Sequence, residues 1–143
     1  MKHEFIMLKY EDIPQSVMYT LRKGHNVVEV DDEIIVNNPY MVHLYSRDKL
    51  PQPTNGFKTF LVSFTNEGEG LDYHGNTIIP TSSLPKFIQN IELAKKEVDD
   101  CIRSKKLARR FKIKEVYLNE LDNLITLCKE AIEEEMYVIH FGI

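Results

Sequence analysis

Hydrophobic positions in the first 80 residues recur mostly at the two-residue period of β-strands. In the clearest case, Phe60, Val62 and Phe64 fall on one face of an extended segment. β-Branched runs on either side of the acidic stretch Asp31–Glu33 are typical of a hairpin. Turn-forming residues interrupt the pattern, most clearly at residues 50–56. Strands are expected at residues 5–8, 27–30, 34–36, 40–45, 57–65 and 77–79.

The second half of the chain changes to the helical period. Apolar residues recur every three or four positions over residues 84–102, which predicts a helix of about five turns or more. The same period over residues 119–135 predicts a second long helix. A shorter helix is expected over residues 11–24, where Pro14 suits a first turn. Residues 137–141 are again typical of a strand, which we expect to return to the sheet.

Together these elements predict an α+β fold. We expect a mostly antiparallel sheet, built from residues of about 4–80 and a C-terminal strand at 137–142, packed against a short N-terminal helix and two long C-terminal helices. The length of 143 residues suits a single domain spanning residues 1–143. Hydrophobic residues make up 43% of the chain and charged residues 28%, which is typical of a globular domain rather than a disordered one.

Neither secretion nor membrane insertion is favoured. The apolar stretch at residues 5–8 is far shorter than a signal-peptide core, and no run approaches the roughly 20 apolar residues of a membrane-spanning helix. Two cysteines, Cys101 and Cys128, do not make a disulfide framework in a chain of this size, and both lie on apolar stripes where buried thiols are expected. We therefore expect a cytoplasmic protein with no membrane partner.

Charge is distributed unevenly along the chain. The 18 Lys and Arg residues and 22 Asp and Glu residues give a formal net charge of -4. Residues 103–114, here called the basic segment, contain no acid and carry Arg103, Lys105, Lys106, Arg109, Arg110, Lys112 and Lys114. Without these seven residues the chain has 11 basic and 22 acidic residues, a formal charge of -11. The basic segment is therefore the main candidate for a binding site.

Several interpretations of the basic segment are open. It is a solvated helix end, where the helix dipole favours cations at a C-terminus, or it is neutralised by acids of the same molecule. Alternatively it binds an acidic protein surface, or single-stranded nucleic acid, whose phosphates Lys and Arg neutralise while Phe111 stacks on a base. Its backbone is expected either to continue the preceding helix or to form a linker with a short strand at residues 111–113.

A glycine-rich stretch at residues 67–75 gathers carboxylates and an imidazole. Its candidate ligands for a hard cation are Glu67, Glu69, Asp72 and His74. Their order does not match a calcium-binding loop, so we interpret the stretch as a flexible hairpin tip and expect no metal site and no cofactor. A metal-assisted hydrolase that uses these four residues is retained as an alternative.

Other catalytic signatures are missing from the sequence. The five histidines show no zinc-ligand spacing, and His43 and His140, both in expected strands, are interpreted as hydrogen-bonded core or edge residues. Neither a phosphate-binding glycine loop nor a nucleophile elbow occurs. This favours a non-enzymatic protein, although catalysis by dispersed residues stays open.

The sequence thus predicts a small, non-enzymatic regulatory or inhibitory protein that binds a macromolecule through complementary charged surfaces. We expect the partner to be a protein. Single-stranded nucleic acid bound by the basic segment is the first alternative, and metal-assisted hydrolysis is the second. Homo-oligomers remain open, because the apolar stripes of two long helices can pair within one chain or between chains.

Overall fold

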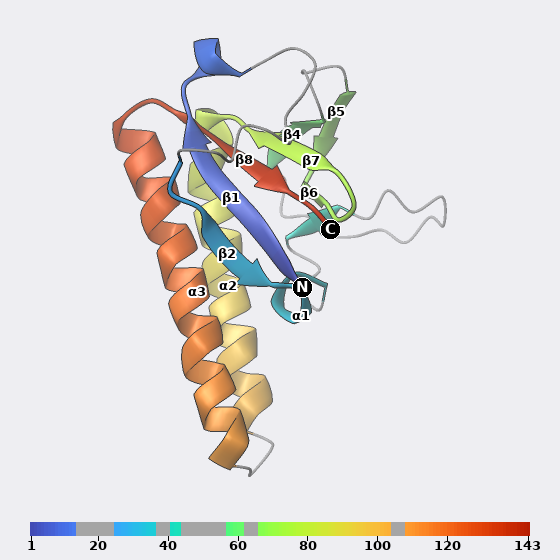
Figure 1. Ribbon diagram of the computed structural model, residues 1–143, viewed down its shortest axis with the longest axis vertical. Coiled ribbons are helices and arrows are strands. Elements are labelled where there is room, and N and C mark those ends of the chain that lie inside the picture. The colour runs from blue at the N-terminus through green and yellow to red at the C-terminus, as the bar shows by residue number, and fades with distance from the viewer. Residues whose placement is uncertain (14–24, 37–40, 44–56, 62–65, 104–107) are drawn as a thin grey trace.

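The computed structural model describes residues 1–13, 25–36, 41–43, 57–61, 66–103 and 108–143 (Figure 1). The strands are β1 (Lys2–Leu8), β2 (Val28–Asp31), β3 (Val42–His43), β4 (Lys58–Leu61), β5 (Asn66–Glu69), β6 (Leu71–Asp72), β7 (Asn76–Ile79) and β8 (Tyr137–Phe141). The helices are α1 (Asp32–Val36), α2 (Leu84–Arg103) and α3 (Ala108–Glu133), and the 3-10 turns are η1 (Tyr10–Asp12) and η2 (Thr81–Ser83).

Among these residues, six strands form one antiparallel sheet in the order β2-β1-β8-β7-β4-β5. The C-terminal strand β8 lies between β1 and β7, with His140 opposite Phe5 on one side and Thr77 on the other. Strands β3 and β6 pair in parallel as a separate two-stranded sheet. The predicted α+β fold, with a mostly antiparallel sheet, a returning terminal strand and two long helices, is confirmed.

Helices α2 and α3 pack on one face of the six-stranded sheet (Figure 1). Because side chains alternate along a strand, Phe5 faces the helices and its neighbour Ile6 faces the other way. Fully buried residues on the helix side include Phe5, Val138, Phe87, Ile91, Leu121 and Leu124. On the opposite face Ile6, Ile78 and Ile139 form a second buried cluster. None of the helices in the described parts of the chain is long and apolar enough to cross a membrane.

The acidic stretch after β2 begins a helix, so the prediction of a hairpin turn at residues 31–33 is wrong. The Asp31 carboxylate accepts a hydrogen bond from the backbone N–H of Glu33 at 2.9 Å, which satisfies an otherwise unpaired donor at the start of α1. Acids in a first turn are also favoured by the helix dipole. The β-branched Ile34 and Ile35 are buried in the core, so tertiary packing overrides their preference for strands.

Helix α3 starts at Ala108, well before the predicted start at residue 119. The two long helices form an antiparallel hairpin braced by ion pairs from α2 to α3, Lys95 with Asp122 at 2.5 Å and Asp99 with Lys114. Charged residues conceal the apolar period at the start of α3, which explains the late prediction. The alternative of a short strand at residues 111–113 is wrong, because these residues are helical.

The glycine-rich stretch contains more regular secondary structure than predicted. Strands β5 and β6 occupy much of residues 67–75, and Gly70 between them has a φ of 80°, a conformation that favours glycine. The hydroxyl of Thr59 donates a 2.7 Å hydrogen bond to the Gly70 carbonyl. The interpretation of the whole stretch as a hairpin tip is therefore wrong for the strand residues, and residues 73–75 form the turn between β6 and β7.

Several expected elements fall partly outside the described residues. These are the N-terminal helix beyond residue 13, the loop at residues 50–56, the end of the 57–65 strand, and all of the 40–45 strand except residues 41–43. Within the described part, residues 10–12 form η1 and residues 42–43 form β3.

Candidate functional site

The basic segment lies at the turn end of the α2–α3 hairpin. Arg103 is the last residue of α2, and residues 108–114 form the first two turns of α3. Figure 1 shows that this end of the hairpin extends beyond the strands of the sheet. Lys105 and Lys106 lie outside the described residues, and of the seven basic side chains that of Lys114 is described. The backbone therefore places the five basic residues on either side of residues 104–107 near one end of the α2–α3 hairpin.

Lys114 is held within the hairpin. Its ammonium group forms an ion pair with Asp99 of α2, and its side chain is only 20% exposed. Because Asp99 neutralises this charge locally, Lys114 attracts an anionic partner only weakly. Internal pairing, one of the interpretations open from the sequence, therefore applies to Lys114.

Helix stabilisation does not explain the other charges of α3. Its first turn contains Arg109 and Arg110 and no acid, and its last turn contains Glu130 and Glu133 and no base. The helix dipole disfavours cations at an N-terminus and anions at a C-terminus, so the charges at both ends of α3 interact unfavourably with it. Among the basic residues within the described helices, the interpretation as a favourable helix C-terminus holds only for Arg103, the last residue of α2.

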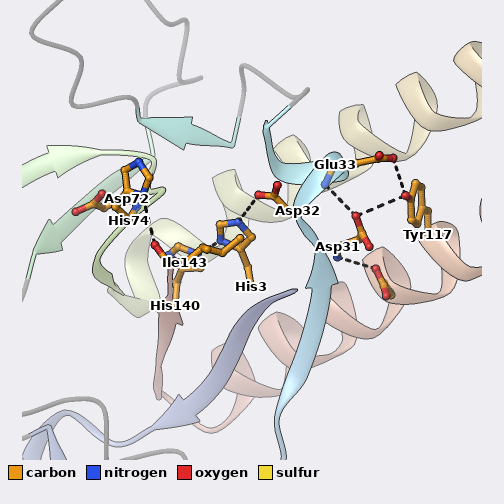
Figure 2. A network of polar contacts seen from close by, with 10 residues as sticks. His3, Asp31, Asp32, Glu33, Asp72, His74, Tyr117, His140 and Ile143 are labelled. Carbon is orange, nitrogen blue, oxygen red and sulfur yellow. Dashed lines mark hydrogen bonds and ion pairs between the residues drawn. The ribbon is translucent and has the colours of Figure 1, made fainter. Parts of the chain in front are cut away.

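A second candidate site, not predicted from the sequence, is a polar network at the end of the sheet where β1 begins and β8 finishes (Figure 2). At its centre His3 of β1 and His140 of β8 are both fully buried, with His3 Nδ1 2.9 Å from His140 Nε2. The ring centroids are 5.1 Å apart and the ring planes differ by 12°. With so short a distance between nitrogens, these values mean that the rings meet edge to edge. The two imidazoles therefore share one hydrogen bond.

The hydrogen bonds of the network all have the same donor-to-acceptor direction, from Thr77 to Asp32. His3 Nε2 lies 3.1 Å from the Asp32 carboxylate, and His140 Nδ1 lies 3.3 Å from the Thr77 hydroxyl. A carboxylate only accepts hydrogen bonds, so His3 donates through Nε2 and accepts through Nδ1. His140 must then donate through Nε2 and accept from Thr77, whose oxygen in turn accepts the backbone N–H of Asp72 at 2.8 Å. Every donor in this series of hydrogen bonds has an acceptor when both rings are neutral.

Burial favours this neutral state. It lowers the pKa of His3 below 6.5, despite hydrogen bonding to Asp32, and burial together with the proximity of His3 holds the pKa of His140 well below 6.5. Burial acts to raise the pKa of Asp32, but hydrogen bonds from Tyr73 and His3 lower it overall. The contact between His3 and Asp32 is thus a hydrogen bond from a neutral ring to a carboxylate.

The same network ties α3 to the junction of β2 and α1. Glu120 of α3 accepts the backbone N–H of Asp31 at 2.8 Å and also forms an ion pair with Lys2. The hydroxyl of Tyr117 donates to Glu33 at 2.9 Å, and burial with this hydrogen bond raises the pKa of Tyr117. The N-terminal end of β1, the start of α1 and the middle of α3 therefore form one connected unit.

Residues of the proposed acidic metal site are used in structural contacts. Glu67 forms an ion pair with Lys58, and the Asp72 carboxylate accepts the backbone N–H of His74 at 3.1 Å. His74 also contacts the Ile143 carbonyl at 3.3 Å. Within the described ranges, no group of three or more His, Cys, Asp or Glu residues is arranged to hold a metal ion.

The sequence carried a partial signal for the polar network. His140 was interpreted as a hydrogen-bonded strand residue, which is correct, and its partner is His3. His43, interpreted in the same way, belongs to the separate sheet of β3 and β6. The signal was a buried polar residue on the core-facing side of each of three neighbouring strands, His3 of β1, His140 of β8 and Thr77 of β7. Cys128 is buried as predicted, which raises its pKa, whereas the side chain of Cys101 lies outside the description.

Comparisons with known proteins give no functional assignment. No protein-family model matches the chain, and neither a curated protein nor a solved structure matches it. The candidate sites are therefore the basic segment at the hairpin end and the buried polar network.

Proposed function

We propose that this protein is a non-enzymatic regulatory or inhibitory protein that binds a macromolecular partner through the turn end of the α2–α3 hairpin. The observation that carries the proposal is the position of the basic segment at an end of the hairpin that extends beyond the sheet (Figure 1). A projecting element with one sign of charge suits recognition of an anionic surface, because complementary charge speeds association and sets specificity.

The charge order of α3 supports this proposal. Arg109 and Arg110 add to the positive end of the helix dipole, so they cost stability where no anion is present. An anionic partner at this position benefits from the cations and from the N–H groups at the start of α3 together. A binding role accounts for a charge arrangement that folding alone disfavours.

An acidic protein surface is the partner that we favour, in the cytoplasm. The rest of the chain carries a formal charge of -11, which does not suit a phosphate backbone wrapped over an extended surface. A single short contact with single-stranded nucleic acid is the alternative, since charges are screened beyond a Debye length of about 8 Å. Metal-assisted hydrolysis gains no support, given the structural contacts of Glu67 and Asp72.

Affinity capture from a lysate of the source cells at low salt tests the proposal. Wild-type protein is compared with the double variant Arg109→Ala/Arg110→Ala and with Lys114→Gln, a matched control whose charge is already paired with Asp99. We expect wild type and the control to retain one protein in stoichiometric amount and the double variant to lose it. Recovery that nuclease treatment abolishes supports nucleic acid, and capture of no stoichiometric partner contradicts the proposal.

A further inference from the structure

The buried histidine pair plays no part in the proposed binding function, yet its geometry restricts how many protons it can hold. Only one hydrogen atom fits between His3 Nδ1 and His140 Nε2, which are 2.9 Å apart. In the neutral pair that hydrogen belongs to His140, because the other nitrogen of His3 donates to Asp32. We propose that this pair is an acid-operated latch, which holds the N-terminal end of β1, α1 and the end of β8 together until protonation breaks the contact between the rings.

The first added proton has one place to go. It binds His140 Nδ1, which requires the Thr77 hydroxyl to stop donating and to accept instead. The Thr77 oxygen already accepts the Asp72 N–H, so its own hydrogen must find a new acceptor. The proton also places a cation on a fully buried ring.

A second proton cannot be accommodated in the closed structure. It must bind His3 Nδ1, which then points an N–H bond at the N–H bond of His140 across 2.9 Å. Two like-charged rings with opposed donors cannot keep this contact, whereas both rings are freely protonated once they reach water. Opening therefore takes up two protons together rather than one at a time.

The groups that face the pair come from every element packed around it. Among the described residues, the charged or titratable ones are Asp32 of α1, Asp31 at the end of β2, Tyr73 and His74 after β6, and the N-terminal amine, which acts on Asp32. Asp32 and Asp31 favour a protonated His3, and His74 and burial oppose it. Helix α2 contributes the apolar ring of Phe87, which packs on Phe5 beside His140.

Backbone hydrogen bonds around the pair identify what the latch releases. The Asp32 N–H donates to the Met1 carbonyl at 3.1 Å, and the N–H groups of Gly142 and Ile143 donate to the Gly75 and Tyr73 carbonyls at 2.8 and 2.9 Å. These bonds fasten the first and last residues of the described chain to α1 and to the turn between β6 and β7. Loss of the histidine contact removes the buried centre that holds these segments against one another (Figure 2).

Long-range ¹H–¹⁵N spectra of protein labelled at histidine, recorded from neutral pH to about pH 4, test the latch. At neutral pH we expect both His3 and His140 to be neutral with the proton on Nε2. Both should remain neutral at pH 6.5, where a free imidazole is half protonated, and then be protonated in one step with a Hill coefficient near 2. The amides of Asp32, Gly142 and Ile143 should lose protection from hydrogen exchange in the same step.

Two variants sharpen the result. His25→Gln removes an exposed histidine outside the polar network and should leave the two-proton step in place. His140→Gln keeps a donor toward His3 but cannot titrate, so its step should involve one proton. The wild-type spectra decide the proposal whether or not this variant folds. Separate titration of the two rings, a charged ring at pH 7, or full protonation without loss of amide protection would overturn the latch.

Discussion

At the scale of single residues, Gly142, directly after β8, lies close against the backbone of the turn between β6 and β7. A Cβ atom at this position would lie 2.5 Å from the Tyr73 carbonyl oxygen and 2.6 Å from that of Gly75. The hydrogen bond from the Gly142 N–H to Gly75 depends on this approach. Glycine is required here because the space beside its Cα is filled by backbone.

Substitution Gly142→Ala should therefore lower the free energy of unfolding by about 2 kcal/mol, in the range typical of overpacking. Gly75→Ala is the matched control, because its added methyl group meets the side chain of Asp72, which can turn away. We expect the control to cost less than about 1 kcal/mol. Urea unfolding of both variants measures the difference, and equal losses would show that the backbone approach at Gly142 is not limiting.

At the scale of elements, the end of α3 is unusual. Glu135 has a φ of 56°, and the hydrogen bonds from Met136 N–H to Ala131 and from Glu135 N–H to Ile132 form a Schellman motif. Glycine normally occupies the left-handed position of this motif, since a side chain there is strained. The helix ends where β8 must turn back toward the sheet.

Glu135→Gly should raise the free energy of unfolding by about 1 kcal/mol, because it relieves this strain. Glu133→Gly, two residues earlier, also exposed and the last residue of α3, should lower it by up to about 1 kcal/mol. Chemical denaturation of the two variants gives the comparison. A loss of stability in both would mean that Glu135 is not strained.

The elements also show how far the sequence alone could lead. Strands β1, β7 and β8 were predictable because they are short apolar runs buried on both faces, and helix α2 because it buries one face and so carries a clear apolar period. Helix α1 was not, because burial of Ile34 and Ile35 outweighs their strand preference. The start of α3 was hidden because its helical form depends on pairing with α2, as the Lys114–Asp99 ion pair illustrates.

The two candidate sites also differ in how far the sequence alone could locate them. The basic segment is contiguous in sequence, so composition alone located it. The histidine pair joins residues at opposite ends of the chain, and its contact follows from β1 and β8 being neighbours in the sheet. Strand order of this kind cannot be read from local patterns.

At the scale of the whole molecule, the buried histidines link folding to pH. Both have lowered pKa values in the folded state, so the unfolded chain binds more protons below about pH 6.5. The contribution of the two histidines to the free energy of unfolding is therefore fully present above about pH 6.5, and it is lost as the pH falls below this value. Asp32, whose folded pKa is also lowered, adds a further loss below about pH 4.

Between about pH 6 and pH 5, the free energy of unfolding of the wild type should fall by up to about 2.7 kcal/mol per pH unit, the slope for two protons. In His140→Gln the slope should be about half as steep, while carboxylates contribute equally to both proteins. Urea unfolding at a series of pH values measures the two slopes. Parallel slopes would show that His140 is protonated equally in the folded and unfolded states.

The division of charge between the basic segment and the rest of the chain is the other property of the whole molecule. The basic residues of this segment flank one end of the hairpin, whereas the remaining residues carry a formal charge of -11. Such a dipolar body orients itself as it approaches an anionic surface. Binding through the hairpin end should therefore depend strongly on salt.

The affinity of the captured partner for wild type, Arg109→Ala/Arg110→Ala and Lys114→Gln, measured between about 50 and 200 mM salt, tests this central claim most directly. The account predicts that the double variant binds at least about tenfold more weakly at low salt, a cost of about 1.4 kcal/mol, with a shallower dependence on salt. Lys114→Gln should stay within about twofold of wild type, because the charge of Lys114 is already paired with Asp99 within the hairpin. Unchanged affinity and salt dependence in the double variant would contradict binding through the end of the α2–α3 hairpin.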